Sequence, residues 1–336
     1  MEVTAVNKYA YSVGRTKALE TKLLDRGKID RMIEAEDAEA VLRVLSETEY
    51  GDLIAEIKSA EEFERILYVG LKRTYSVVRS FYPDPELVNL FTLKYDFHNL
   101  KVLLKSKFSD QGADELLIDL GEIADVVSKL MKEDISEISK KLPEDYARAV
   151  ERMLDEFNTS KDPQIIDALL DAEMFALMRE FASQSDFLLK LLKMYIDLNN
   201  IKILIRSKKL AKSKSFLGYA LLENGGLPKD DLLKIHDRSL DAMISELCKT
   251  EYGEIIAEGA EHYEKEESLF LFEKLFDDMI MEYMKKAKYV AFGLEPLAGY
   301  IVAKENEIKL IRMLLVGKLN EIPNERIKEM VREGYV

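Results

Sequence analysis

Apolar residues recur at steps of three and four along nearly the whole chain, which is the spacing of one face of an α-helix. Two stretches show this most clearly. In the first, the apolar positions are Phe97, Leu100, Leu104 and Phe108. In the second, they are Leu198, Ile201, Leu204 and Ile205. No stretch alternates apolar and polar residues with the period of a strand, and no Asn-Gly or Asp-Gly turn separates apolar runs. The pattern predicts an all-α fold.

The two periodic stretches are copies of each other. Residues 96–107 read DFHNLKVLLKSK and residues 197–208 read DLNNIKILIRSK, 101 residues later, with six of twelve positions identical. A fainter third copy, KENEIKLIRM, occupies residues 304–313. A second motif, TEYGDLIAE at 48–56, returns as TEYGEIIAE at 250–258, and its spacing of 202 is twice 101. Two independent matches therefore indicate one unit that occurs three times.

The repeat predicts three similar helical domains, which we place at residues 1–110, 111–213 and 214–336. The borders near 110 and 213 lie in polar stretches that follow the first two repeat helices. The middle domain lacks the Thr-Glu-Tyr-Gly motif, and its closest remnant is Glu-Asp-Tyr at 144–146.

The last repeat is longer than the one before it, because the third copy follows the second by about 107 residues. We expect the short insertion either in the acidic stretch 261–267 or at residues 293–297. The prolines fall between periodic stretches, where each can begin or end a helix. Asn324, after Pro323, is expected to cap a last helix over residues 325–333.

Composition excludes several classes of function. The formal charge of −14 opposes nucleic acid as the main partner, because phosphate binding needs an attractive field. A single cysteine, Cys248, rules out an internal disulfide, and we expect it to be a small buried hydrophobe. No uncharged apolar run approaches the roughly 18 residues of a membrane span, and residues 1–5 lack the regions of a signal peptide. We therefore expect a cytoplasmic protein that does not itself cross a membrane.

Candidate catalytic and metal sites are few. The sequence has no Gly-rich phosphate loop, no Gly-x-Ser-x-Gly elbow, no Cys-x-x-Cys and no His-Glu-x-x-His. His262 and Glu266 have a permissible ligand spacing, but we interpret them as part of a solvated charged face. Asp278 and Glu282, one turn apart after Asp277, resemble the magnesium helix of all-helical isoprenoid synthases, but no second such helix is found. Asp167 and Asp171 are not such a motif. We assign no catalytic, cofactor-binding or metal-binding residue.

Two polar features stand out within the helical segments. Asp96 with Asn99, and Asp197 with Asn200, recur one turn apart within apolar helices, and we interpret them as structural groups whose hydrogen bonds to neighbouring helices fix packing. A run of basic residues without an intervening acid follows the second repeat helix: Lys202, Arg206, Lys208, Lys209, Lys212 and Lys214. These cations either complement the helix macrodipole or contact lipid headgroups or an acidic partner.

The C-terminal third carries a specific resemblance. The motif GLEPL at 293–297 is followed by Tyr300, by KENEIKLIR at 304–312 and by Gly-Lys at 317–318. This series closely resembles the C subunit of archaeal and bacterial V-type (A-type) ATP synthases, whose eukaryotic counterpart is the d subunit of the vacuolar ATPase. The N-terminal YAYSVGR at 9–15 is similar to the same family.

The resemblance implies a funnel of three helical domains around a pseudo-threefold axis. Such a protein is a non-catalytic socket of the central stalk. It receives the rotor shaft, made of the D and F subunits, and sits on the proteolipid ring at the cytoplasmic face of the membrane. It couples ATP chemistry to proton or sodium transport and holds no nucleotide, cofactor or small-molecule substrate. Two alternatives stay open: a generic helical-repeat adaptor and the magnesium-dependent enzyme built on Asp278.

Overall fold

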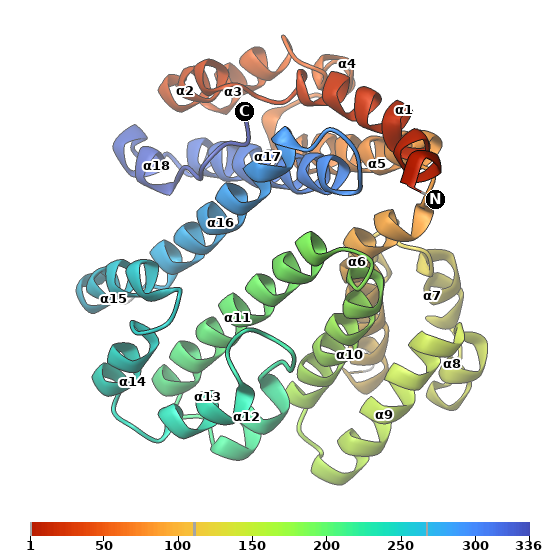
Figure 1. Cartoon of the computed structure of the whole chain (residues 1–336), viewed down its shortest axis with the longest axis vertical. Coiled ribbons are helices and arrows are strands. Elements are labelled where there is room, and N and C mark those ends of the chain that lie inside the picture. Colours follow the sequence, from red (N-terminus) through yellow and green to blue (C-terminus); the bar gives the residue numbers. More distant parts are fainter. Residues whose placement is uncertain (1, 110–111, 267) are drawn as a thin grey trace. The chain divides into compact units, whose positions relative to one another are not determined.

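The structure is a computed structural model that describes residues 2–109, 112–266 and 268–336 (Figure 1). Every regular element in these ranges is a helix, which confirms the predicted all-α fold. The chain forms two compact units. The first combines the N-terminal residues up to Pro85 with residues 258–336, and the second comprises residues 86–257. The division into three domains with borders at 110 and 213 stays a prediction.

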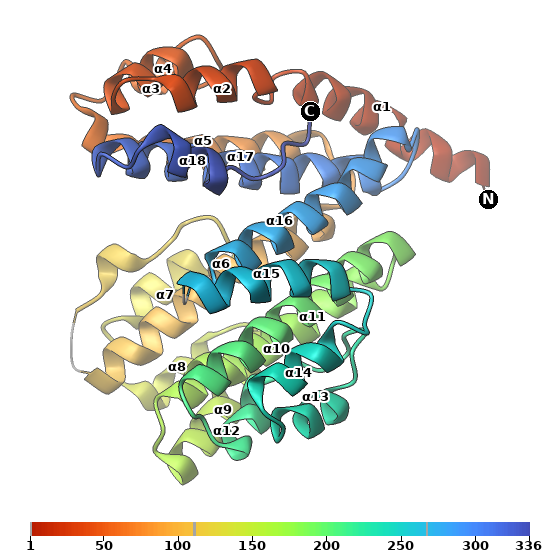
Figure 2. The same ribbon diagram turned by 90° about the vertical axis from the view of Figure 1, so that its left-hand side faces the viewer.

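The first unit joins both ends of the chain, so that red and blue ribbons lie side by side in Figures 1 and 2. Its N-terminal elements are α1 (Glu2–Glu20), α2 (Arg26–Glu34), α3 (Ala38–Leu45), α4 (Gly51–Ile54), η1 (Ala60–Glu62) and α5 (Phe63–Phe81). Its C-terminal elements are α16 (Phe270–Lys285), η3 (Lys286–Tyr289), α17 (Glu295–Leu319) and α18 (Asn324–Met330). Helix α15 (Gly253–Glu266) spans the border between the two units.

Helix α17, which carries the third copy of the repeat, is the central helix of the first unit. It packs against α1, α3, α5, α16 and α18. Most of its residues are buried around the whole circumference, and these include the charged Lys304 and Glu307. A helix covered on every side buries whatever polar groups it carries, so those groups need partners inside the protein.

The second unit holds the first two copies of the repeat, on its two longest helices. Its elements are α6 (Pro85–Ser109), η2 (Asp114–Leu116), α7 (Ala124–Leu130), α8 (Ile135–Lys141), α9 (Glu144–Ser160), α10 (Gln164–Ala182), α11 (Asp186–Lys209), α12 (Lys214–Ala220), α13 (Lys229–His236) and α14 (Leu240–Leu247). Helix α10 packs between α9 and α11, as Figure 1 shows.

The apolar stripe predicted for residues 97–108 forms part of the core of this unit. Phe97, Leu100 and Leu104 have no exposed surface and pack in one cluster with side chains from α7, α8, α9 and α10. Phe108 differs, because 39% of it is exposed; it contacts Phe157 with ring centroids 4.2 Å apart. The repeat helix α6 therefore buries its stripe mainly against helices that follow it in the chain.

Prolines lie at helix borders, as predicted. Pro85 begins α6, Pro296 lies in the first turn of α17, and Pro163 directly precedes α10. The expected cap of the last helix is wrong. Asn324 is the first residue of α18, and its side-chain oxygen accepts a hydrogen bond from Lys318 (2.6 Å) instead of capping the helix. A buried ammonium competes for the oxygen that the helix end would otherwise use.

Cys248 follows α14 and is half-buried, so the expectation of a buried cysteine is wrong. It occupies the C-cap position of a short helix, where the chain turns back to the surface.

Candidate functional site: three polar clasps

Each of the first two repeat helices holds a loop through a buried asparagine. The Asn99 side chain donates to the carbonyl of Ile118 and accepts from its N–H, both at 2.8 Å. Asn200 makes the same two bonds to Leu222, at 2.9 and 2.8 Å. Neither asparagine has exposed surface. An amide that pairs with both backbone groups of one residue fixes that residue's position and leaves no buried polar atom without a partner.

One turn before Asn99, a buried carboxylate holds the next part of the same loop. Asp96 accepts from the N–H groups of Glu122 (3.1 Å) and Ile123 (3.0 Å) and from the hydroxyl of Tyr146 (3.0 Å). Burial raises the pKa of Asp96, although all three donors stabilise its ionised form. Tyr146 belongs to the segment that the sequence identified as the remnant of the Thr-Glu-Tyr-Gly motif. Its contact with Asp96 supports that identification.

The second repeat helix carries an equivalent carboxylate. Asp197 accepts from the N–H groups of Gly226 and Leu227, both at 2.9 Å, and from the hydroxyl of Tyr252 at 2.8 Å. Burial and this hydrogen bond raise the pKa of Tyr252. Asp197 has no exposed surface, so these donors take the place of water around its carboxyl group. These contacts confirm that the recurring Asp and Asn side chains are structural, but most of their partners are backbone groups of loops and not, as predicted, neighbouring helices.

The third repeat helix makes the corresponding contacts with different residues. Glu307 of α17 accepts from the N–H of Leu24 (2.6 Å) and the hydroxyl of Tyr50 (2.9 Å). Lys304, one turn earlier and 1% exposed, bonds both Glu307 and Glu49. Its ammonium also lies 4.5 Å from the centre of the Tyr50 ring, a cation–π contact.

We call these three sets the polar clasps. The first consists of Asp96, Asn99 and Tyr146, the second of Asp197, Asn200 and Tyr252, and the third of Lys304, Glu307 and Tyr50. In the register of the repeat, Lys304 stands where the other helices have Asp, and Glu307 stands where they have Asn. The third copy was visible in the sequence, but this exchange of roles was missed. The aligned copies, DFHN at 96–99, DLNN at 197–200 and KENE at 304–307, were the signal that could have revealed it.

The clasps also locate the extra residues of the last repeat. In the first clasp, 50 positions separate Asp96 from Tyr146, whose hydroxyl it accepts from. In the second clasp, 55 positions separate Asp197 from Tyr252. The distance from Tyr146 to Asp197 (51 residues) and the distance from Tyr252 to Lys304 (52 residues) differ by only one residue. Most of the added length therefore lies between Asp197 and Tyr252. The expected positions, 261–267 and 293–297, are wrong.

Two glycines permit the close approach of the aspartates. A Cβ at Gly121 would lie 1.9 Å from an oxygen of Asp96, and one at Gly225 would lie 2.2 Å from an oxygen of Asp197. Neither carboxylate has room to withdraw, since both are buried.

Gly225→Ala is therefore expected to lower the free energy of unfolding by about 1–3 kcal/mol, because the loop must shift away from Asp197. Chemical denaturation measures the change. Gly218→Ala is the matched control, since a Cβ there meets nothing within 4 Å. Equal effects of the two substitutions would contradict this account.

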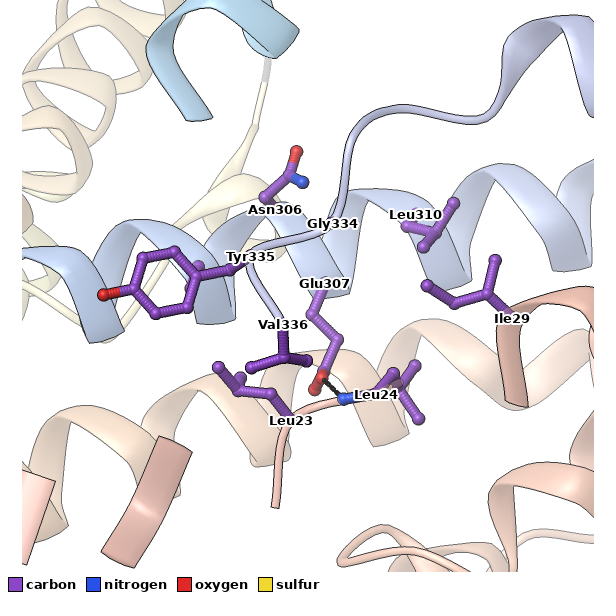
Figure 3. Close-up of a pocket in the computed structure, with 10 residues that line it drawn as sticks. Leu23, Leu24, Ile29, Asn306, Glu307, Leu310, Gly334, Tyr335 and Val336 are labelled. Atoms are coloured by element: carbon purple, nitrogen blue, oxygen red, sulfur yellow. Dashed lines mark hydrogen bonds between the residues drawn. The ribbon is translucent and has the colours of Figure 1, made fainter. Parts of the chain in front are cut away.

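A small cavity beside the third clasp shows how closely the chain end is packed (Figure 3). Its volume is about 20 Å³, room for no more than a water molecule. Tyr335 and Val336 lie over α17 at this point, and the Tyr335 hydroxyl donates to Glu20 (3.3 Å). The space beneath Tyr335 and Val336 is therefore too small for a ligand.

The carboxylates considered as magnesium ligands pair instead with cations of the protein. Asp278 accepts from Lys274 (2.8 Å) and from the backbone N–H of Glu333 (2.6 Å). Although burial opposes it, Lys309 and Arg332 lower the pKa of the neighbouring Asp277.

The other acidic candidates behave in the same way. Asp167 pairs with Lys105 at 2.7 Å and Asp171 with Lys101 at 2.5 Å, across helices α6 and α10. The side chain of Glu266, the proposed partner of His262, lies outside the described residues. Among the side chains that the structure describes, no group of three His, Cys, Asp or Glu residues is arranged to hold a metal ion.

The basic run lies at the C-terminal end of α11 and in the turn to α12. Lys212 donates to Gln164 (2.9 Å) and Lys214 pairs with Asp237 (2.6 Å). Leu210, in the middle of the run, is 63% exposed. This region, residues 202–214, therefore combines cations with an exposed apolar side chain.

Across the described ranges, none of the helices has the length and hydropathy that crossing a bilayer requires.

Comparison with known proteins gives consistent results. The family model described as ATP synthase (C/AC39) subunit matches residues 12–330. The chain is 29% identical over 322 residues to the C subunit of the V-type sodium ATPase of Enterococcus hirae, and the match covers 94% of this chain and 95% of that protein. It is 28% identical over 349 residues to the C subunit of the A-type ATP synthase of Methanocaldococcus jannaschii, covering 96% and 86%. The similarity extends over nearly the whole of each chain.

Proposed function

The chain belongs to the ATP synthase (C/AC39) subunit family, and from this membership we propose that it is the central-stalk connector of a V/A-type rotary ATPase. The family is a non-catalytic part of the rotary complex, so the magnesium-dependent enzyme is set aside. The match over residues 12–330 is the observation that carries the proposal. It spans both compact units and all three clasps.

In the proposed role the chain passes torque from the rotor shaft, made of the D and F subunits, to the proteolipid ring at the cytoplasmic face of the membrane. Torque transfer needs a body that does not deform under load. The buried clasps support this, because each connects a long repeat helix to a distant loop through several hydrogen bonds. Three domains around a pseudo-threefold axis remain part of this proposal.

Binding to purified shaft and ring tests the proposal. We expect the chain to bind an immobilised D–F subcomplex and, separately, detergent-solubilised proteolipid ring, without added nucleotide. The alternative, a generic helical-repeat adaptor, predicts binding to neither. Failure to bind both would contradict the connector role while leaving family membership intact.

We propose that the basic region 202–214 forms part of the membrane-facing surface. The triple substitution Lys208→Glu, Lys209→Glu and Lys212→Glu is then expected to weaken attachment to the membrane sector. The effect should be larger at low salt, because screening of exposed charges is weaker there. Co-sedimentation with the membrane sector over a range of ionic strengths measures it.

A matched control reverses three exposed lysines elsewhere in the same unit: Lys129, Lys132 and Lys140. It makes the same change in net charge at a different place. Circular dichroism must show that both variants fold. Equal attachment of the two variants at every ionic strength would place the membrane contact elsewhere.

A further inference from the structure

An open cleft of about 290 Å³ lies between α1, α5 and α17 in the first unit. Four of its lining residues are cationic: Arg15, Lys22, Arg73 and Lys304. Glu49 is the one acidic residue among those that line it. The chain as a whole carries −14, so this excess of positive charge is the reverse of its average surface.

The four cations differ in how they are neutralised. Lys304 is buried against two glutamates, and Arg73 pairs with Asp52 (2.7 Å). Arg15 hydrogen-bonds the Tyr11 hydroxyl (3.1 Å) and lies over an aromatic ring, but no carboxylate of the described residues contacts it. Lys22 has no carboxylate partner in the described chain either. Two cationic groups at the mouth of the cleft are therefore available to a ligand.

The cleft also offers apolar surface. Leu19, Leu53 and Val77 line it, and Leu19 lies between Arg15 and Lys22 on one stripe of α1, at helical steps of four and three. Tyr11 extends the same stripe by one turn and is 64% exposed. Exposed tyrosine beside arginine is the composition typical of the energetically important part of a protein interface.

We propose that this cleft is a docking site for an acidic, apolar segment of a partner protein. One carboxylate side chain of the partner enters the cleft and pairs with Arg15 and Lys22, and neighbouring apolar side chains pack on Leu19 and Tyr11. The cleft volume lies at the lower end of the roughly 300–1,000 Å³ range of small-molecule sites, and it also accommodates one or two side chains. Charge complementarity and the apolar stripe together favour a protein segment over a free anion.

Photo-crosslinking in intact cells tests the inference. The probe is p-benzoylphenylalanine in place of Tyr11, which keeps an aromatic side chain at an exposed position. After irradiation, mass spectrometry identifies the crosslinked peptide. We expect a peptide that carries Asp or Glu among apolar residues. Adding Arg15→Glu and Lys22→Glu should lower the crosslinking yield about tenfold or more, because two attractive contacts become repulsive.

The matched control adds Arg43→Glu and Lys58→Glu, two exposed cations of the same unit that do not line the cleft. This variant should crosslink as well as the parent. Replacing the identified carboxylate of the partner with lysine should restore crosslinking to the Arg15→Glu, Lys22→Glu variant.

Four results would overturn the inference: no crosslink at position 11, crosslinks to lipid alone, crosslinked peptides without Asp or Glu, or equal yields in the two charge-reversed variants. None of them would affect the connector role, which is tested by binding to the shaft and the ring.

Discussion

Replacing Glu307 by alanine is expected to lower the free energy of unfolding by about 3–5 kcal/mol, the largest effect predicted for a single residue here. Glu307 accepts from the Leu24 N–H and the Tyr50 hydroxyl and pairs with Lys304. Without it, Lys304 keeps Glu49 alone as its carboxylate partner, and two buried donors lose their acceptor. Chemical denaturation followed by circular dichroism measures the loss.

A double-mutant cycle separates the pair from its surroundings. Lys304→Met alone leaves Glu307 buried without its cation, so it should also be strongly destabilising. The double variant Lys304→Met, Glu307→Ala should cost less than the sum of the two single changes, because neither member of the pair is then left as a buried charge without the other. Glu325→Ala, on the exposed side of α18, is the control and should change little. Strict additivity would show that Lys304 and Glu307 do not act together.

Leu204→Ala is expected to cost about 2–5 kcal/mol. Leu204 has no exposed surface and lies in the middle of α11, so its truncation leaves a cavity that rigid neighbouring helices cannot fill. Chemical denaturation again measures the effect. Leu210→Ala, at the exposed end of the same helix, should change stability by less than about 0.5 kcal/mol. A loss of stability below about 0.5 kcal/mol for Leu204→Ala would contradict the observed packing.

Local features of the fold were predictable because they depend on residues close in sequence. The apolar stripe of α11 gave the buried face correctly, from Leu198 to Ile205. The prolines marked helix borders because they lack a donor and restrict the preceding residue. The predicted cap of α18 was wrong because it depended on a residue outside the helix. The side-chain oxygen of Asn324 accepts a hydrogen bond from Lys318 of the preceding helix and does not cap α18.

The repeat was also visible in the sequence, and it identified Tyr146 as the remnant of a motif that had otherwise diverged. The position of the extra residues in the last repeat was predicted wrongly, because sequence similarity between the copies fades in the loops, where extra residues are tolerated. The hydrogen bonds from Tyr146 to Asp96 and from Tyr252 to Asp197 show which positions of the two repeats are equivalent in space. These positions allow the lengths of the repeats to be compared.

The sequence by itself determined that this protein is helical, that a helix motif recurs along the chain and that the recurring Asp and Asn residues are structural. Each of these rests on spacing along the chain, which the periodicity of a helix records directly. Only the tertiary structure decided that Lys304 and Glu307 replace that pair in the third clasp, with partners at Leu24, Glu49 and Tyr50. Those partners come from the opposite end of the chain, and charge pairing over such a separation follows from how the two ends pack together. No local pattern records it.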